Sequence, residues 1–373
     1  MARAAYIHIP FCAHKCDFCD FAAFAGVDDL TPEYCDVVVG EIAQRISIAP
    51  NETTLESLFY GGGTPGYIDP SQLRKVHNAV AEAVGLDEDA EVTLETTPQS
   101  ITLDKAKAWL DMGINRISIG VQSFSDFELK AMGRDHTASE ALAGIERARE
   151  AGFANVAIDL MYGVPEQTVD SWRDSLQKAV SLGLPHMSAY GLTIAGNSPL
   201  LSRYPLESAA YPVEDAFVVM YEMLLDQTAQ AGLQQYEISN FSHRDKRSKH
   251  NLTYWANDEY LAFGVSAHRY ANGVRSSNYR SLKRYMRDCL GNETFEPIDE
   301  KTRAQEGIFL GLRRTEGIHL EQYRQRYGIS LDVLLEDKIK RLSEGGFLTV
   351  EDGWLKLSPS GVLVSNIVLA ELI

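Results

Sequence analysis

Three cysteines stand close together near the start of the chain. Cys12, Cys16 and Cys19 lie in the spacing C-x3-C-x2-C, while Cys35 and Cys289 are isolated. Disulfides between cysteines this close in sequence cannot join distant parts of a fold, but a curled loop can bring the three thiols onto one inorganic centre. Structural zinc sites close with four ligands, so three cysteines leave an open coordination position. The spacing therefore predicts a metal or iron–sulfur loop at which a small ligand can bind.

Zinc is the alternative occupant of this loop, with His8 or His14 as its fourth ligand. The aromatic residues Phe11, Phe18 and Phe21 flank the cysteines and are expected to form an apolar shell around the loop. Such a shell protects and tunes an iron–sulfur cluster. The sequence therefore favours a cluster over zinc.

The elements that must position this loop repeat along the first 240 residues. Short apolar, β-rich runs alternate there with amphipathic stretches. The six runs are Ala4–Ile9, Leu55–Tyr60, Glu91–Glu95, Arg116–Gln122, Asn155–Leu160 and His186–Leu192. Repeated β-then-α units predict parallel strands joined by right-handed crossovers. Six units predict an α/β fold that curls into most, but not all, of a barrel.

The amphipathic stretches carry helix signals. Between Thr168 and Leu182, apolar side chains recur at helical spacing on one face. Asp69-Pro70 with Gln72 resembles a capping box with proline at the first helical position, and Thr31-Pro32 has the same cap-then-proline form. We expect helices to begin at both pairs.

Polar and glycine-rich residues follow the predicted strands. The cysteine loop follows the first run, and Gly61-Gly62-Gly63-Thr64-Pro65 follows the second. Glu95, Gln122 and Asp159 stand at the ends of the next three runs. Parallel α/β barrels place their active sites at the carboxyl ends of their strands. We therefore expect these residues to meet the cysteine loop at one mouth of the barrel.

The glycine triplet has two explanations. A tight turn after a strand is the plainer one, because glycine is the usual residue there. The alternative is a ligand that approaches the backbone closely. The segment lacks the lysine of a Walker loop and the G-x-G-x-x-G form of a dinucleotide site. Its place beside the cysteine loop favours the ligand-binding explanation.

Composition bounds the class of protein. The chain has 373 residues, of which 45% are apolar and 23% charged, enough for one large core and a smaller domain. A formal charge of −17 argues against a general nucleic-acid binder. No signal peptide or transmembrane segment is expected. The clustered cysteines fit a reducing compartment, so we expect a cytoplasmic protein.

The last part of the chain differs in character. From about Glu300, helical stretches lead to a hairpin signal over Phe347–Ser358, and a final helix follows Pro359. This order predicts a small winged-helix-like domain. Basic and acidic residues balance at ten each from Lys301 to Ile373, which favours a packing or lid role over DNA binding. The expected domains are a barrel over 1–240, a connecting segment over 241–299 and the C-terminal domain over 300–373.

These motifs together resemble a known family. Tyr6-Ile7-His8-Ile9-Pro10-Phe11-Cys12, the cysteine spacing and Gly61–Pro65 are similar to the radical S-adenosylmethionine (SAM) superfamily, in its oxygen-independent coproporphyrinogen oxidase-like branch. Gly120–Phe124, Arg134–His136, Ile158–Pro165 and the C-terminal domain also match. The resemblance implies a partial (β/α)6 radical-SAM barrel. It also implies a [4Fe-4S] cluster held by Cys12, Cys16 and Cys19, with S-adenosylmethionine on the fourth iron.

The resemblance further assigns nine residues to the cofactor. Tyr6 would lie beside the cluster and S-adenosylmethionine, Phe18 would pack the adenine, and Gly62, Gly63 and Thr64 would hold the methionine end. Glu95 would support cofactor binding, while Gln122, Arg134 and Asp159 match positions used for cofactor or second-ligand contacts. An ordinary ion pair between Arg134 and Asp159 is the structural alternative for those two side chains.

Two features select a subgroup. Coproporphyrinogen oxidases resemble C-x3-C-x2-C-x-C, whereas Phe21 occupies the fourth-cysteine position here. The segment His250-Asn251-Leu252-Thr253-Tyr254-Trp255 resembles the H-N-x-x-Y-W signature of the heme chaperone subgroup, HemW. An imidazole can ligate heme iron, and the two aromatic residues can pack a porphyrin face. The basic residues Arg244, Lys246, Arg247 and Lys249 would meet its propionates. The alternative for His250 is a hydrogen-bonded residue over an aromatic core pair.

The resemblance implies a heme chaperone that binds heme and passes it to an unidentified acceptor protein. A homodimer and transient contact with membrane-bound acceptors are compatible with that role. The alternative is a radical SAM enzyme that oxidatively decarboxylates a porphyrinogen, like oxygen-independent coproporphyrinogen III oxidase. The chain departs from the branch at Thr97, Ala195 and Ser266, where relatives usually have asparagine, glutamate and glycine. These departures concern the substrate cavity and not the cluster.

Overall fold

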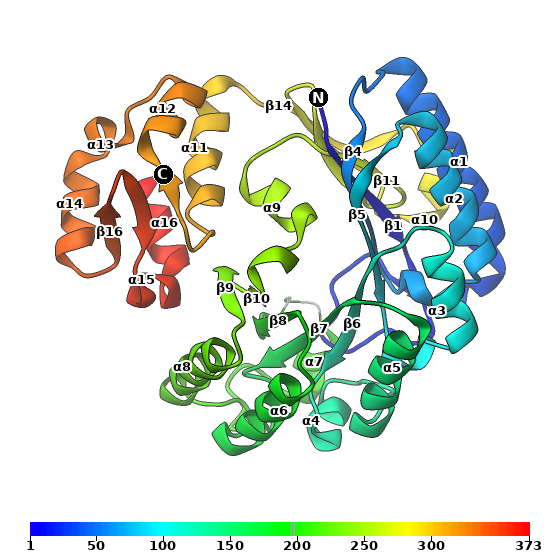
Figure 1. Cartoon of the computed structure of the whole chain (residues 1–373), viewed down its shortest axis with the longest axis horizontal. Coiled ribbons are helices and arrows are strands. Elements are labelled where there is room, and N and C mark those ends of the chain that lie inside the picture. Colours follow the sequence, from blue (N-terminus) through cyan, green and yellow to red (C-terminus); the bar gives the residue numbers. More distant parts are fainter. Residues whose placement is uncertain (195, 197) are drawn as a thin grey trace.

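A curved nine-stranded sheet forms the centre of the computed structural model, which describes residues 1–194, 196 and 198–373 (Figure 1). Ala195 lies outside the described residues. Six parallel strands make up most of the sheet: β1 (Ala4–Ile9), β4 (Leu55–Gly62), β5 (Leu86–Thr96), β6 (Arg116–Gln122), β7 (Asn155–Tyr162) and β8 (His186–Gly191). Each predicted run coincides with one of these strands, which confirms the α/β prediction.

The sheet does not close into a full barrel. β11 (Leu261–Phe263) pairs in parallel with β1 at one edge, and β10 (Asn240–Ser242) pairs antiparallel with β8 near the other. The outermost strand there is β9 (Gln234–Glu237), which pairs with β10 along its length and makes a single antiparallel bridge from Glu237 to Arg314. The two edges therefore remain apart, as the prediction of a partial barrel requires.

A helix follows each of the six parallel strands and covers the outside of the sheet (Figure 1). These helices are α1 (Thr31–Ile48), α2 (Pro70–Ala83), α3 (Leu103–Leu110), α5 (Ala138–Ala151), α6 (Val169–Ser181) and α8 (Glu214–Gln230). Shorter elements are β2 (Phe11–Cys12), β3 (Phe24–Ala25), α4 (Asp126–Ala131), α7 (Pro199–Arg203) and the 3-10 turns η1 (Asp28–Leu30), η2 (Pro65–Tyr67) and η3 (Pro98–Ser100).

Two predicted helix caps are wrong in detail. Asp69 does cap α2, but its carboxylate accepts from the Ser71 amide at 2.8 Å, and Gln72 does not complete a capping box. Thr31 is the first residue of α1 and not its cap, because η1 runs directly into the helix and puts Leu30 at the N-cap. Local motifs thus located the helix starts but not the capping bonds.

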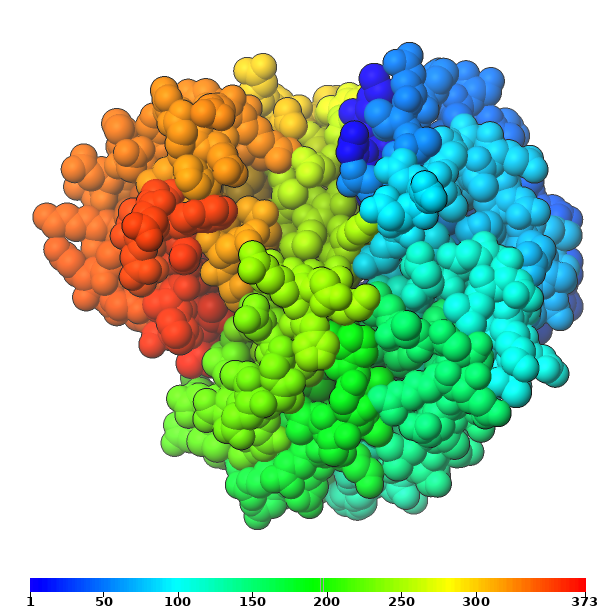
Figure 2. All heavy atoms as spheres, in the orientation of Figure 1, coloured from blue at the N-terminus to red at the C-terminus, as the bar shows by residue number. Residues whose placement is uncertain are grey.

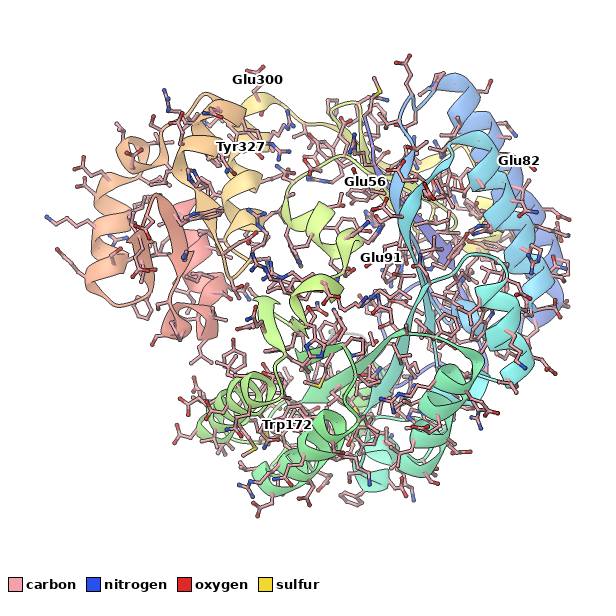
Figure 3. The ribbon with its side chains drawn as sticks, viewed as in Figure 1. Glu56, Glu82, Glu91, Trp172, Glu300 and Tyr327 are labelled. Carbon is pink, nitrogen blue, oxygen red and sulfur yellow. The ribbon has the colours of Figure 1, made fainter. Side chains whose placement is uncertain are left out.

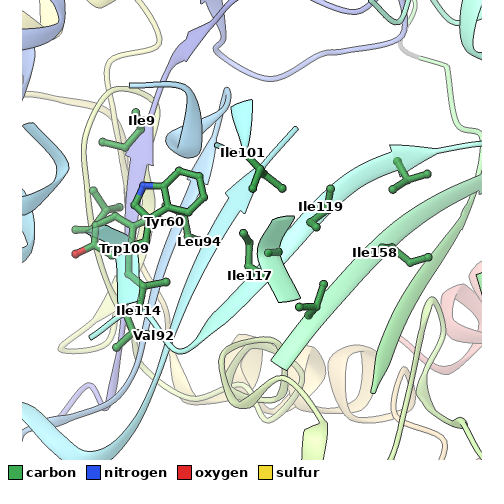
Figure 4. Close-up of a cluster of buried hydrophobic side chains, with 14 of the residues drawn as sticks. Ile9, Tyr60, Val92, Leu94, Ile101, Trp109, Ile114, Ile117, Ile119 and Ile158 are labelled. Carbon is green, nitrogen blue, oxygen red and sulfur yellow. The ribbon is translucent and has the colours of Figure 1, made fainter. Parts of the chain in front are cut away.

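Apolar side chains fill the space between the sheet and the outer helices. Ile9, Tyr60, Leu94 and Ile117 from successive strands pack near Trp109 of α3 (Figure 4). The predicted apolar face of α6 is buried through Trp172, whose indole N–H donates to the Met220 carbonyl of α8 at 2.9 Å. Burial of this apolar surface, at about 25 cal/mol per Å², fixes the strands whose ends carry the polar residues.

The connecting segment places a helix inside the curved sheet. This segment contains η4 (Arg244–Lys246), α9 (Lys249–Trp255), β12 (His268–Ala271), β13 (Val274–Asn278), α10 (Leu282–Arg287) and β14 (Asn292–Pro297). Tyr60 of β4 bonds to α2 on the outside, so the alternating residues Ser57 and Phe59 face inward. His250 of α9 contacts both of these side chains. Glu91 of β5, labelled in Figure 3, accepts a hydrogen bond from the Ser248 hydroxyl just before α9.

The C-terminal elements form a separate lobe with its own apolar core (Figure 2). They are α11 (Glu300–Gly311), β15 (Ile318–His319), α12 (Leu320–Tyr327), α13 (Leu331–Leu334), α14 (Glu336–Glu344), β16 (Leu348–Glu351), β17 (Trp354–Leu357), α15 (Pro359–Leu363) and α16 (Ser365–Leu372). The hairpin turns at Asp352-Gly353, both with positive φ, as its sequence predicts. The exact domain boundaries stay a prediction. No helix in the described residues is long and apolar enough to cross a membrane.

Candidate functional site

A cavity of about 390 Å³ lies at the carboxyl ends of the parallel strands. It brings together the three clustered cysteines and eight of the nine side chains assigned to the cofactor. The eight are Phe18, Gly62, Gly63, Thr64, Glu95, Gln122, Arg134 and Asp159. Residues from five strand ends thus converge on one site, as the strand-end pattern predicts.

The cysteine loop has a donor set that fits an iron–sulfur centre. Cys12 Sγ lies 3.4 Å from Thr64 Oγ1, and Cys16 Sγ accepts a bond from the Arg134 guanidinium at 3.0 Å. Burial raises the pKa of Cys12 to about 11, so a bound metal must supply the charge that holds its thiolate. No three His, Cys, Asp or Glu side chains in the described residues are gathered tightly enough to ligate one ion as they stand. Binding of a cluster by the three cysteines would therefore require the loop to tighten.

The surroundings of the loop disfavour His8 as a fourth zinc ligand. Its Nδ1 lies 3.1 Å from Tyr6 Oη and its Nε2 lies 3.0 Å from the Ala22 carbonyl, so both nitrogens are engaged. The predicted aromatic shell is only partly formed. Phe11 is buried and Phe18 packs against an apolar cluster, but Phe21 is 67% exposed. Phe21 therefore borders the cavity without enclosing it.

Arg134 acts on the cysteine loop and does not pair with Asp159. Its second guanidinium nitrogen donates to the Gly120 carbonyl at 2.8 Å, which fixes the bond to Cys16. Asp159 instead accepts from Ser118 Oγ at 3.3 Å, and burial raises its pKa. The ion-pair alternative is therefore wrong. A cation that donates to a cluster sulfur stabilises negative charge on that sulfur.

The glycine triplet is required by packing. Gly62 has φ +115°, and a Cβ there would lie 2.6 Å from the His8 ring. A Cβ on Gly63 would lie 2.7 Å from the Pro10 carbonyl carbon. Both glycines let the end of β4 press against the cysteine loop. Close packing against the cysteine loop therefore accounts for both glycines, and their ligand-binding role stays a prediction.

Glu95 is a strongly perturbed carboxyl group of the cavity. Burial, with a smaller contribution from the Asp159 charge, raises its pKa to about 8, although the Gly62 amide donates to it at 3.3 Å. A carboxyl group in this state loses its proton when a cation binds beside it. It is therefore suited to holding the amino group of a ligand.

Replacing Glu95 by glutamine should flatten the pH dependence of stability of the cofactor-free protein. A carboxyl group whose pKa is raised by folding stabilises the fold below its unfolded pKa, and this stability is lost as pH rises through about 8. The loss is about 1.4 kcal/mol for each unit of pKa shift, reduced by water in the cavity. Urea unfolding at about pH 6 and about pH 9 measures it, with the exposed Glu88→Gln of the same strand as control. Equal pH slopes in wild type and Glu95→Gln would contradict the raised pKa.

Tyr6 lies behind the cavity and not in its wall. The Gly61 Cα approaches so closely that a Cβ there would lie 2.9 Å from the Tyr6 ring. The ring packs on Phe59 with centroids 6.1 Å apart and lies 6.5 Å from the His250 ring. Tyr6 therefore lies between the cysteine cavity and helix α9. Its bond to His8 supports the cysteine loop.

His250 is buried inside the barrel, away from the cavity of the cysteine loop. It is 1% exposed, its Nδ1 lies 3.1 Å from Ser57 Oγ, and its Nε2 lies 2.8 Å from Tyr254 Oη. Burial and the charge of Arg116 lower its pKa to about 3, so the ring is neutral. This environment matches the alternative to heme ligation, in which His250 is a hydrogen-bonded core residue. Ligation of heme iron by Nε2 would require Tyr254 to move first, because Tyr254 occupies that nitrogen.

The predicted basic patch is largely neutralised. Lys246 pairs with Asp245 at 3.6 Å, Arg247 with Glu316 at 3.7 Å and Lys249 with Asp89 at 3.5 Å. Arg244 remains exposed on η4. Exposed pairs of this kind are worth at most about 1 kcal/mol, so they reduce the positive charge that the patch presents but a propionate could still displace them.

Several residues of the cavity escaped the sequence reasoning. Ser118, Gly120, Met161 and Tyr190 line it beside the predicted side chains. Ser118 and Gly120 share a face of β6 with Gln122, and Met161 shares a face of β7 with Asp159, so strand alternation was the signal that could have found them. Gln122 also has φ +67°, a strained conformation for a residue with a side chain.

Known proteins resemble the chain over nearly its whole length. The radical SAM superfamily matches residues 6–179, and the HemN C-terminal domain matches residues 298–364. Proteins named heme chaperone HemW from Bacillus subtilis and Lactococcus lactis are 34% and 32% identical. Each match covers 98% of this chain, with 97% and 95% of the respective relative. The structure of coproporphyrinogen III oxidase (HemN) from Escherichia coli shares the fold, with TM-score 0.86 and 22% identity over 99% of this chain and 89% of that one.

Proposed function

Because this chain belongs to the heme chaperone HemW family of radical SAM proteins, we propose that it binds heme and transfers it to an acceptor protein. The observation that carries the proposal is identity of 34% over 98% of the chain to a relative named heme chaperone. Phe21 supports it, because the coproporphyrinogen oxidase pattern has a cysteine at this position. The acceptor is an unidentified protein, and the proposed compartment is the cytoplasm.

Membership of the radical SAM superfamily implies a [4Fe-4S] cluster and S-adenosylmethionine. We propose that Cys12, Cys16 and Cys19 hold the cluster and that the surrounding cavity holds the cofactor. The bound pair would supply one-electron chemistry when reduced. Glu95 would hold the cofactor amino group as a carboxylate, Arg134 would stabilise the charge on Cys16, and Phe18 would exclude water from the adenine.

Heme is cargo in this proposal, and helix α9 is its candidate docking element. His250 stays the proposed iron ligand, on condition that Tyr254 releases its Nε2. Tyr254 and Trp255 are the proposed porphyrin contacts. A homodimer and transient contact with membrane-bound acceptors remain compatible with this role.

Replacing His250 by alanine should weaken hemin binding at least about tenfold and shift the Soret maximum, because the iron loses a ligand. The exposed His243→Ala is a matched control, since it lies seven residues earlier and its ring bonds to the Gly232 carbonyl at the surface. Anaerobic titration of the cluster-loaded protein with hemin, followed by absorbance, measures both. An unchanged spectrum and affinity would remove His250 from the ligand role without testing whether heme binds elsewhere.

The second candidate function is a radical SAM enzyme that acts on a porphyrinogen. One observation favours it: the cavity keeps every residue assigned to the cofactor except Tyr6, with the strained Gln122 in its wall. A pure carrier has no need for a strained residue beside a reactive cofactor. Turnover of S-adenosylmethionine with coproporphyrinogen separates the two candidates.

A further inference from the structure

Gln122 is the central residue of a γ-turn at the carboxyl end of β6. The Ser123 amide donates to the Val121 carbonyl at 2.9 Å, and Gln122 between them has φ +67°. The pairing of β6 with β7 shifts register at this point, between Gly120 and Gln122. A γ-turn with positive φ is rare and strained for a residue with a side chain. Such a turn persists only where the surrounding structure holds it.

The strained turn folds the Gln122 side chain back over Gly120. A Cβ on Gly120 would lie 2.9 Å from Gln122 Nε2 and 3.8 Å from the Arg134 guanidinium. All three residues line the cavity of the cysteine loop. The turn thus presents an amide group, which can both donate and accept hydrogen bonds, beside the guanidinium that donates to Cys16.

A buried carboxyl group, that of Glu128 in α4, holds this turn from behind. Glu128 is 1% exposed, and its Oε2 accepts from Ser123 Oγ at 2.6 Å. The same oxygen accepts from Gln167 Nε2 at 3.0 Å, and Oε1 accepts from Ser171 Oγ at 2.6 Å. All three donors are neutral, so these bonds join separate elements and do not neutralise a cation. Buried hydrogen bonds of this kind fix geometry because water does not compete for them.

The Glu128 carboxyl group also connects the turn to the neighbouring strand and helix. Gln167 donates to the Met161 carbonyl of β7 at 3.3 Å and accepts from the Gly163 amide at 2.7 Å. Ser171 lies in the first turn of α6. Met161 lines the cavity, whereas Glu128 does not. Glu128 can therefore act on a ligand in the cavity only through the residues that it holds.

We infer that Glu128 is a positioning residue for the ligand of the cysteine cavity, and that it acts through Ser123 to hold the strained turn that presents Gln122. This inference rests on the proposed function, which makes S-adenosylmethionine that ligand. A residue that only stabilises the fold would change the free energy of unfolding without changing the affinity of the folded protein. A positioning residue changes both.

The test measures binding of S-adenosylmethionine to the full-length, cluster-loaded protein by anaerobic equilibrium dialysis. Ser123→Ala removes the bond between the turn and Glu128 and should weaken binding about tenfold. Ser171→Ala is the matched control, because it removes an equally short bond to the same carboxyl group but leaves the turn attached. It should lower stability while binding stays within about twofold of wild type. Urea unfolding and iron content show that each variant is folded and loaded.

A double-mutant cycle identifies the residue through which Glu128 acts. Glu128→Gln keeps the size of the side chain but leaves one oxygen to accept from three donors, so it should also weaken binding about tenfold. In a Gln122→Ala background the same change should have no further effect, because the side chain that it positions is absent.

The outcomes separate this inference from the proposed function. If Ser123→Ala binds within about twofold of wild type, if Ser171→Ala weakens binding as much, or if the effects of Glu128→Gln and Gln122→Ala multiply, the positioning role is overturned and the proposed cofactor site stands. If wild type itself does not bind S-adenosylmethionine, the proposed cofactor site fails first and the inference falls with it. If Glu128→Gln does not fold, the comparison of Ser123→Ala with Ser171→Ala decides alone.

Discussion

Replacing Cys16 by alanine should abolish loading of the iron–sulfur cluster. Two cysteines cannot hold a cluster that already relies on three, and Arg134 would lose the sulfur to which it donates. After anaerobic reconstitution, the visible absorbance of the variant and its iron and sulfide should fall to background. Binding of S-adenosylmethionine should fall at least about tenfold with them, because the open iron site is lost.

Cys289→Ala is the matched control for this experiment. Cys289 is partly buried, lies outside the cavity and should leave loading unchanged. The metal content of the wild type could also contradict the cluster assignment. Stoichiometric zinc without visible absorbance in the wild type would return the loop to the zinc alternative, with the exposed His14 as the remaining fourth ligand in reach of the loop.

Replacing Glu41 by alanine should cost about 3–5 kcal/mol of unfolding free energy, which is the cost of breaking a buried charge network. Glu41 of α1 is fully buried and accepts from Arg45 at 2.7 Å. It also accepts from the Gly264 amide at 2.9 Å, the Asn278 side chain at 2.7 Å and the Tyr285 hydroxyl at 2.7 Å. The last three partners come from the segment that closes the β11 edge of the sheet, so the variant removes an acceptor that four donors share.

Urea unfolding of the cofactor-free protein measures this change. Glu33→Ala is the control, because it lies on the exposed side of the same helix and should change stability by less than about 0.5 kcal/mol. A loss below about 1 kcal/mol for Glu41→Ala would show that water or a rearrangement satisfies the four donors.

The parallel strands and the cysteine cavity were predictable because their signals are local. Each strand is a short apolar run, and the residue that follows it marks the mouth of the barrel. The environment of His250 was not predictable in this way. It depends on Ser57, Phe59 and Tyr6, which lie about 190 or more residues away in the sequence. The same is true of Arg313, whose stacking on Trp255 joins two domains.

The predictions of the helix-capping bonds and of the burial of Phe21 failed for a related reason. A motif such as Asp69-Pro70 specifies where a helix begins, but the backbone decides which amide reaches the carboxylate. Phe21 is apolar and adjacent to the cysteines, yet the loop turns it outward, while Phe11 and Phe18 pack on apolar neighbours. Residue type and spacing thus predict which chemical groups gather at the cavity better than they predict which side chains are buried around it.

The transfer of heme tests the central claim most directly. The protein is reconstituted anaerobically, loaded with hemin, mixed with apomyoglobin as acceptor and, in parallel, given S-adenosylmethionine, a reductant and coproporphyrinogen. We expect the acceptor to gain its heme spectrum as the donor loses its own, with no decarboxylated porphyrinogen. Decarboxylated product at catalytic turnover, together with heme that never leaves the protein, would contradict this account and make the chain an enzyme of its branch.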